Sequence, residues 1–151
     1  MNTLPRTAWL LGYGGVLPFL ILTLMVWLDK SLPLGTLVNT IGWLLSYAAI
    51  ILSFMGAVSW GVALGMDTRL RQREEANELL IYSVLPALLA WATLLLPSAS
   101  WALWSMSLLV VLAYFADQRL IFPRVNADYA RLRLQLTAAV ALLLLLAGFG
   151  V

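Results

Sequence analysis

The 151-residue chain contains no cysteine and no histidine, and only 11% of its residues are charged. The absence of cysteine excludes disulfides, thiolate metal sites and cysteine nucleophiles. The absence of histidine excludes imidazole ligation of haem or metal, the usual serine triads and the commonest proton relay. We therefore expect no cofactor and no metal, and a protein that is not an enzyme.

Apolar residues are abundant instead and make up 63% of the chain. A soluble domain has about 45–50% apolar and about 25% charged residues. So few polar residues cannot cover a surface in water, whereas lipid suits this composition if the backbone polar groups are paired within helices. The apolar runs do not alternate, which favours helices over barrel strands. The sequence predicts an all-α polytopic membrane helix bundle, with residues 1–151 forming a single membrane domain.

Five apolar stretches are near the length that crosses a bilayer, since a helix rises about 1.5 Å per residue and the hydrocarbon core is about 30 Å thick, and the fifth of them is short. They cover residues 8–28, 38–64, 78–96, 101–122 and 136–151. The second stretch exceeds what a perpendicular crossing needs, so we expect it to tilt or to project beyond the bilayer. Residues 123–135 form either an amphipathic helix along the membrane surface or a basic extension of the fifth helix.

Basic residues are distributed unequally between the two sides of these five crossings. Only Lys30 falls on the side opposite the N-terminus. The N-terminal side holds Arg6, Arg69, Arg71, Arg73, Arg119, Arg124, Arg131 and Arg133. Because basic loops stay in the cytoplasm, we predict the N-terminus inside and the C-terminus outside, most simply in the bacterial cytoplasmic membrane. The net charge of +2 then reflects topology, and the expected partner is membrane lipid rather than nucleic acid.

Small residues recur at every fourth position of the second stretch. They are Ala49, Ser53, Ala57, Gly61 and Gly65. In a helix these positions share one face, and small side chains allow membrane helices to approach closely. We predict that this face packs against protein. The partner is another helix of the chain, which is the favoured alternative, or another membrane protein or a second copy.

Pro18 and Pro86 lie about half-way along the first and third stretches. A proline inside a helix removes one hydrogen bond and clashes with the carbonyl four residues earlier, so both helices are expected to kink. The two prolines share a Val-Leu-Pro context, and Tyr47 and Tyr114 have a similar spacing, which is a weak sign of a parallel duplication. The kinks either serve packing alone or frame a binding site between the first and third helices.

Asp117 and Arg119 are the charged residues that lie deepest in an apolar stretch. An ionisable group in a membrane helix is a candidate functional residue. Residues two apart do not share a helix face, so we expect Asp117 to pair with Arg69 or Arg133 instead. A structural ion pair is the favoured interpretation, and a proton or substrate site is the alternative.

Two of the seven tryptophans are further candidates. Most tryptophans fall near the expected membrane interfaces, as an aromatic belt requires. Trp91 lies deeper and shares its helix with Pro86, while Trp60 adjoins the small-residue face. Both are candidates for a core or a cavity wall, and packing is the simpler interpretation.

Four segments and one acid carry a resemblance to a known family. They are residues 11–19 (LGYGGVLPF), 47–61 (YAAIILSFMGAVSWG), 83–91 (SVLPALLAW) and 129–137 (YARLRLQLT), with Asp117. Together they resemble the domain-of-unknown-function family 3429, small polytopic proteins of bacteria similar to a vertebrate mitochondrial inner-membrane protein. The resemblance covers most of the chain and implies fold and membrane location but no activity. Many members carry His or Arg where this chain has Ser59, so a role that needs a basic group there is not expected.

Two classes of function fit these features. The small-residue face and the lack of catalytic groups favour an accessory or scaffold protein that acts through helix–helix contacts. The paired prolines, Trp91 and Asp117 favour the alternative, a protein that binds or transports a small molecule or lipid. A largely polar cavity between the first and third helices would support the alternative, and a solid core with an exposed small-residue face would support the scaffold.

Overall fold

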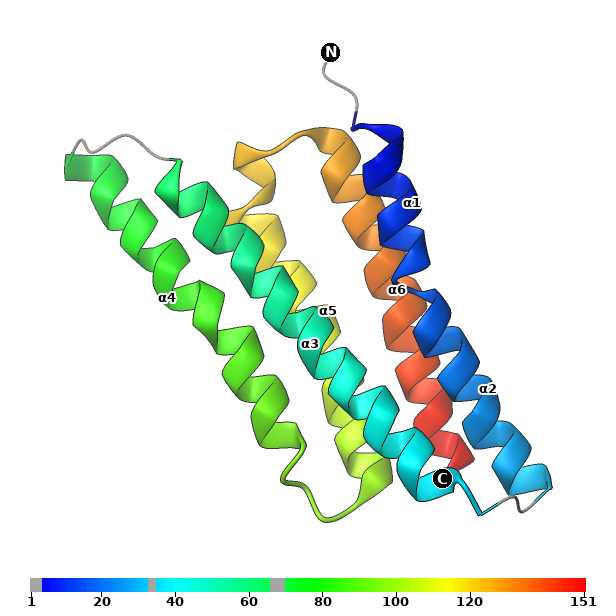
Figure 1. Ribbon diagram of the computed structural model, residues 1–151. Coiled ribbons are helices and arrows are strands. Elements are labelled where there is room, and N and C mark those ends of the chain that lie inside the picture. The colour runs from blue at the N-terminus through cyan, green and yellow to red at the C-terminus, as the bar shows by residue number, and fades with distance from the viewer. Residues whose placement is uncertain (1–3, 33–34, 66–69) are drawn as a thin grey trace.

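The computed structural model describes residues 4–32, 35–65 and 70–151, without side chains for residues 70–73. Over these residues the chain forms α-helices joined by short connections and one 3₁₀ turn (Figure 1). The elements are α1 (Arg6–Gly14), α2 (Leu17–Ser31), α3 (Leu37–Leu64), α4 (Leu70–Thr93), α5 (Ala99–Leu120), η1 (Phe122–Arg124) and α6 (Ala127–Gly150).

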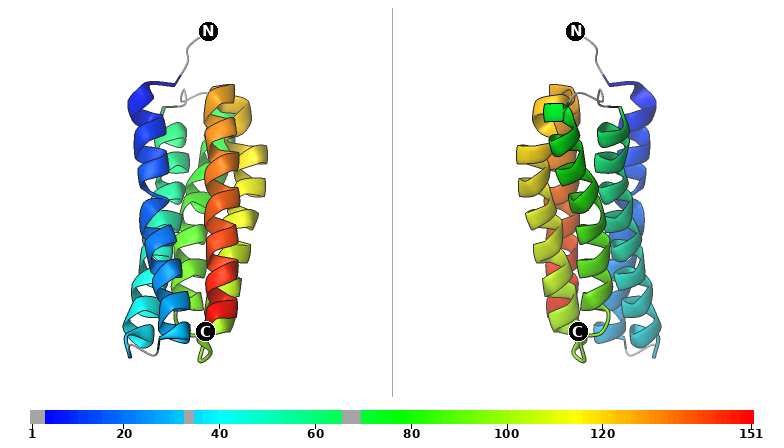
Figure 2. Two further views of the ribbon diagram at one scale, coloured as in Figure 1. Left: turned by 90° about the vertical axis from the view of Figure 1, so that its right-hand side faces the viewer. Right: turned by 90° about the vertical axis from the view of Figure 1, so that its left-hand side faces the viewer.

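Five helical segments of the described chain are long and apolar enough to cross a membrane: α1 with α2, then α3, α4, α5 and α6. The 28 residues of α3 span about 42 Å, which exceeds the hydrocarbon core of about 30 Å. The start of α1 and the end of α6 lie at opposite ends of the bundle (Figures 1 and 2), as five crossings require. The prediction of a five-span all-α membrane bundle is confirmed.

Helix α3 packs against α2, α4 and α5. The α1–α2 crossing and α4 lie on opposite sides of it, and α5 packs against α6 (Figures 1 and 2). Large side chains of α2, α3, α5 and α6 fill the main core, which includes Phe19, Leu44, Leu52, Leu103, Met106 and Leu144. A smaller cluster around Leu79 and Ile121 joins α4 to the end of α5.

The two central prolines have different structural roles. Helix α1 ends at Gly14 and α2 begins at Leu17, so the first crossing is interrupted and Pro18 lies in the first turn of α2. A proline costs little there, because the N–H groups of a first turn have no acceptor within the helix. Helix α4, by contrast, continues through Pro86 to Thr93. The two prolines therefore do not occupy equivalent positions in the first and third crossings, as a duplication would require.

The fifth crossing begins earlier than predicted. Helix α6 starts at Ala127, and the side chain of Asn126 caps it by accepting a hydrogen bond from the Asp128 N–H at 3.1 Å. The basic segment before residue 136 is thus an extension of the crossing helix and not a separate surface helix. The third crossing ends at Thr93 rather than at residue 96, because the next three N–H groups bond to carbonyls three residues earlier.

The small-residue face predicted to be buried is mostly exposed. Ser53, Ala57, Gly61 and Gly65 are exposed and Ala49 is half-buried. At Gly61, no described atom outside the backbone of its own helix lies within 4 Å of the position that a Cβ would occupy. The prediction that this face packs inside the bundle is therefore wrong.

The buried face of α3 is the neighbouring row of residues. The buried residues of α3 are Thr40, Ile41, Leu44, Leu45, Ala48, Leu52, Gly56, Ser59 and Ala63. At Gly56 the helix comes very close to α4, because a Cβ there would overlap the carbonyl oxygen of Ser83. Two neighbouring rows of α3 share the four-residue spacing, and only the row with Gly56 faces the other helices.

Candidate functional site

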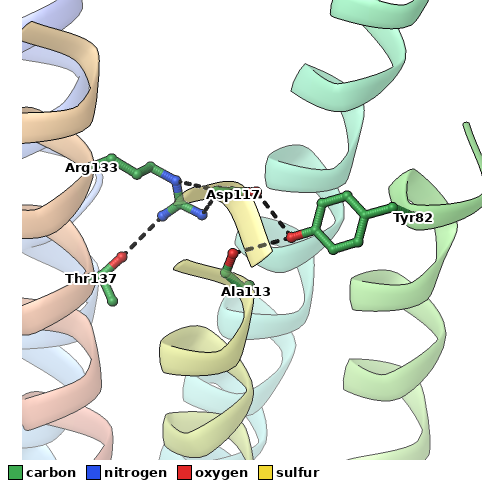
Figure 3. Close-up of polar contacts among 5 residues, drawn as sticks. All are labelled: Tyr82, Ala113, Asp117, Arg133 and Thr137. Carbon is green, nitrogen blue, oxygen red and sulfur yellow. Dashed lines mark hydrogen bonds and ion pairs between the residues drawn. The ribbon is translucent and has the colours of Figure 1, made fainter. Parts of the chain in front are cut away.

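A buried ion pair joins α5 to α6 (Figure 3). Asp117 on α5 is 3% exposed and Arg133 on α6 is 7% exposed. Asp117 Oδ2 accepts hydrogen bonds from Arg133 Nη2 at 2.7 Å and from Nε at 3.0 Å. The short connection through η1 turns the chain back and brings these residues together. The predicted pairing of Asp117 with Arg133 is confirmed, whereas Arg69, the other predicted partner, lies outside the described residues.

Two further side chains complete this network (Figure 3). The Tyr82 hydroxyl on α4 lies 2.9 Å from Asp117 Oδ1 and 3.1 Å from the carbonyl oxygen of Ala113, and it donates its one proton to either acceptor. Arg133 Nη1 donates to Thr137 Oγ1 at 3.2 Å. Both carboxylate oxygens are thus within reach of a donor, which offsets the cost of removing the charge from water. The network ties together α4, α5 and α6.

The remaining charges near this end of the bundle are more exposed. Arg119 is exposed, and the hydrogen bonds of Asp117 among the described residues go to Tyr82 and Arg133 rather than to it. Arg124 of η1 forms an ion pair with Glu75 of α4 at 2.8 Å. An exposed pair of this kind contributes about 0–1 kcal/mol. The buried network of Asp117 and Arg133 is therefore the charged contact that matters most for stability among the described residues.

A cavity of about 590 Å³ lies beside the network, between α1, α3 and α6. Its walls are mostly apolar, and the polar side chains among its described lining residues are Tyr47, Tyr129, Arg133 and Thr137. Three lining residues, Leu11, Ile50 and Phe54, are strongly exposed and mark the opening. Because they belong to helices that cross the membrane, the cavity opens sideways toward lipid.

The break between α1 and α2 creates this cavity. After the break α2 packs against both α3 and α6, whereas before it α1 packs against α6 and diverges from α3. Gly12 permits the α1–α6 contact, because a Cβ at this position would lie 3.1 Å from Leu136 Cδ1. At the break itself, the Tyr47 hydroxyl donates to the carbonyl oxygen of Gly15 at 3.0 Å. The divergence of α1 from α3 leaves space that side chains do not fill.

The other predicted site residues are scattered. Tyr47 lines the cavity, but Tyr114 packs instead against Phe122, with 5.5 Å between ring centroids. Trp60 and Trp91 are 49% and 58% exposed. The interpretation of both tryptophans as core residues is wrong, because both side chains are exposed. Neither is among the described residues that line the cavity between α1, α3 and α6, and Trp60 lines a smaller groove between α3 and α4.

The predicted position of a binding site also needs correction. Pro18 lies near the cavity end of α2, but Pro86 is buried in α4 on the far side of α3. No described residue of α4 lines the large cavity. The prediction of a site between the first and third crossings is therefore wrong, because α3 separates these two crossings. The cavity lies instead between the first, second and fifth crossings.

Three residues of the site, Tyr82, Tyr129 and Thr137, were not identified from the sequence. Tyr129 and Thr137 each lie four residues from Arg133 on α6, and this spacing is a signal that could have indicated them. Tyr82 offers no such signal, since it is an isolated tyrosine in an apolar helix. Ser59 is fully buried, and its hydroxyl has no hydrogen-bond partner among the described residues.

Comparison with known proteins identifies the family of the chain. No curated protein and no solved structure matches it. A family model described as "Protein of unknown function (DUF3429)" matches residues 4–149. The match spans all five crossings, the ion pair and the cavity. The chain therefore belongs to the DUF3429 family.

Proposed function

We propose that this integral membrane protein binds a lipid-like hydrophobic molecule in the cavity between α1, α3 and α6, as a binding or transport protein and not as an enzyme. The observation that carries the proposal is the cavity itself. Its volume of about 590 Å³ falls within the range of about 300–1,000 Å³ that is typical of small-molecule sites. Apolar walls with a few convergent polar groups are also typical of such sites.

The position of the opening supports a ligand that arrives through the membrane. The exposed rim residues Leu11, Ile50 and Phe54 lie at the level of the crossing helices. A hydrophobic molecule dissolved in the bilayer can enter there without passing through water. If the N-terminus is cytoplasmic, as the distribution of basic residues indicates, the cavity belongs to the inner leaflet of the bacterial cytoplasmic membrane.

Filling the cavity tests this function. Ile51 lines the cavity, so Ile51→Trp should occupy the binding space. Ile81 lies on the exposed face of α4, and Ile81→Trp is the matched control. We expect mass spectrometry of the purified protein to find a bound lipid-like molecule with the parent and with Ile81→Trp but not with Ile51→Trp. The same bound molecules in all three proteins would contradict the proposal.

A second function, that of an accessory or scaffold protein, is favoured by the exposed face of α3. Ser53 and Ala57 border a shallow groove of about 230 Å³ between α3 and α4, with Trp60 at its edge. Exposed small side chains allow a helix of another membrane protein, or of a second copy, to approach closely. This proposal assigns the small-residue face to a partner outside the chain.

A pair of glycines on α3 tests the scaffold function. Gly61 and Gly42 are both exposed, and at neither would a Cβ meet a described atom within 4 Å outside the backbone of its own helix. We expect Gly61→Leu to abolish cross-linking to a partner in native membranes, and Gly42→Leu, at the other end of α3, to preserve it. Both variants should melt like the parent. Unchanged cross-linking in Gly61→Leu would rule out this face as the contact.

A further inference from the structure

Most of the polar side chains among the described lining residues of the cavity lie along one face of α6. Tyr129, Arg133 and Thr137 are spaced by four residues on α6, so their side chains lie one above another, and all three line the cavity. The hydroxyl of Tyr47, on the opposite wall, already donates its proton to the Gly15 carbonyl oxygen. The polar part of a ligand would therefore face α6, and its apolar part would face α1 and α3.

Arg133 supplies hydrogen-bond donors at this face. Its guanidinium has five N–H groups, and three of them are engaged with Asp117 and Thr137. Among the described residues, the other two N–H groups are left for the Tyr129 hydroxyl or for a ligand. A guanidinium has no acceptor, so the ligand atom that meets it must be a hydrogen-bond acceptor.

The charge of Arg133 is already balanced. Asp117 lies 2.7 Å from Arg133 Nη2, and both side chains are almost completely buried. An anionic ligand would bring a second negative charge close to Asp117 in a region shielded from water, where an uncompensated charge is costly. A neutral carbonyl or hydroxyl oxygen can accept from Arg133 without that cost.

We propose that the ligand is a neutral amphiphile whose carbonyl or hydroxyl oxygen accepts a hydrogen bond from Arg133 and whose apolar tail leaves between α1 and α3. This inference rests on the proposed binding function and adds the chemistry and the orientation of the ligand. The exposed side chains of Leu11 and Phe54 mark the exit of the tail. The Asp117–Arg133 pair then favours ligands with a neutral hydrogen-bond acceptor over anionic ligands.

Competition between three molecules whose chains have the same number of carbon atoms, with the ester carbonyl carbon counted, tests the chemistry of the head group. Monododecanoylglycerol is neutral and carries ester and hydroxyl oxygens, dodecyl phosphate is anionic, and dodecane has no head group. The full-length protein in mild detergent is incubated with an equimolar mixture, and the bound molecules are counted by native mass spectrometry. A hydrogen bond to a charged group is worth about 1.5–3 kcal/mol, so monododecanoylglycerol should exceed each competitor by about tenfold or more.

Asp117→Asn provides a change of charge at nearly constant shape. Without the carboxylate, the positive charge of Arg133 is no longer balanced, and the preference should change to dodecyl phosphate. The inference is overturned if dodecyl phosphate or dodecane binds the parent as well as monododecanoylglycerol does. The competition on the parent protein decides the question even if Asp117→Asn does not fold.

The cavity-filling variant separates this inference from the binding function. If Ile51→Trp loses all three molecules while Ile81→Trp keeps them, the molecules occupy the cavity, and their ranking on the parent tests the head-group chemistry. If Ile51→Trp binds them as the parent does, the cavity is not the site, and both the function and the inference fail. A cavity that binds but prefers the phosphate leaves the function standing and removes only the inference.

Discussion

Gly56 of α3 lies directly against the backbone of Ser83 in α4, and a Cβ on Gly56 would overlap the Ser83 carbonyl oxygen. Only glycine permits this separation between the two helices. In lipid the hydrophobic effect does not hold helices together, so close contact between backbones is a main source of attraction. The contact between Gly56 and Ser83 therefore sets the distance between α3 and α4.

We expect Gly56→Ala to lower the melting temperature in detergent. The added methyl group fits only if α3 and α4 move apart, and overpacking of this kind costs about 1–3 kcal/mol. Gly61→Ala is the matched control on the same helix. It meets no described atom within 4 Å outside its own helix backbone, and alanine favours helix over glycine, so its melting temperature should equal or exceed that of the parent. Equal melting of Gly56→Ala and the parent would refute the close contact.

The buried ion pair should be strongly coupled. Removing one partner of a buried pair costs about 3–5 kcal/mol, because the other charge is left uncompensated. Asp117→Asn should therefore destabilise the protein, and the double variant with Arg133→Gln should lose less than the sum of the single losses. Thermal melts of the three variants measure this coupling, and additive losses would exclude it. Glu75→Gln, which breaks the exposed pair with Arg124, should cost less than about 1 kcal/mol.

Two buried serines should respond in opposite ways to loss of the hydroxyl. Ser59 is fully buried, and its hydroxyl has no partner in the described chain, so Ser59→Ala should leave the free energy of unfolding unchanged or raise it. The Ser107 hydroxyl donates to the Ala141 carbonyl oxygen at 2.8 Å, so Ser107→Ala should lower it by about 1 kcal/mol. Unfolding of both variants in detergent makes the comparison. A larger loss for Ser59→Ala would show that its hydroxyl has a bonding partner.

The orientation in the membrane can be read with reporter fusions. The distribution of basic residues predicts an inside N-terminus, and five crossings then fix the location of every connection. A fusion after Asn77 should report the cytoplasm, and fusions after Lys30, Ser100 and Val151 should report the outside. A cytoplasmic C-terminus would contradict this topology.

Hydropathy alone was sufficient to locate the crossings, because each needs about 20 apolar residues however it packs. It failed at the start of α6, where Arg131 and Arg133 count against a membrane helix. The cost of Arg133 is removed by Asp117 on another helix, and a local average does not include that contact. Asp117 was identified for the opposite reason, since a lone acid in an apolar run stands out in the sequence.

The buried face of α3 and the position of the cavity could not be predicted from the local sequence. Of two adjacent rows of α3, the one through Gly61 has a small residue at every fourth position, whereas the one through Gly56 alternates small residues with leucine. Which row is buried depends on where α4 packs against α3. That position is marked by the contact between Gly56 and Ser83, which lies in another segment of the chain. The cavity arises because α1 leaves α3 at the break and packs on α6 through Gly12. The residues around Pro18 indicate an interruption but not the direction that the helix takes.

The ion pair has a consequence for the way the chain enters the membrane. Asp117 and Arg133 are separated by 16 residues and belong to consecutive crossings. Inserted alone, each would carry an uncompensated charge near the end of its helix, at a cost below the about 2.5–3.5 kcal/mol that applies to the centre of a membrane helix. Inserted as a hairpin, α5 and α6 carry a pair with no net charge. We expect these two crossings to leave the insertion machinery together, after α4 has placed Tyr82 to receive them.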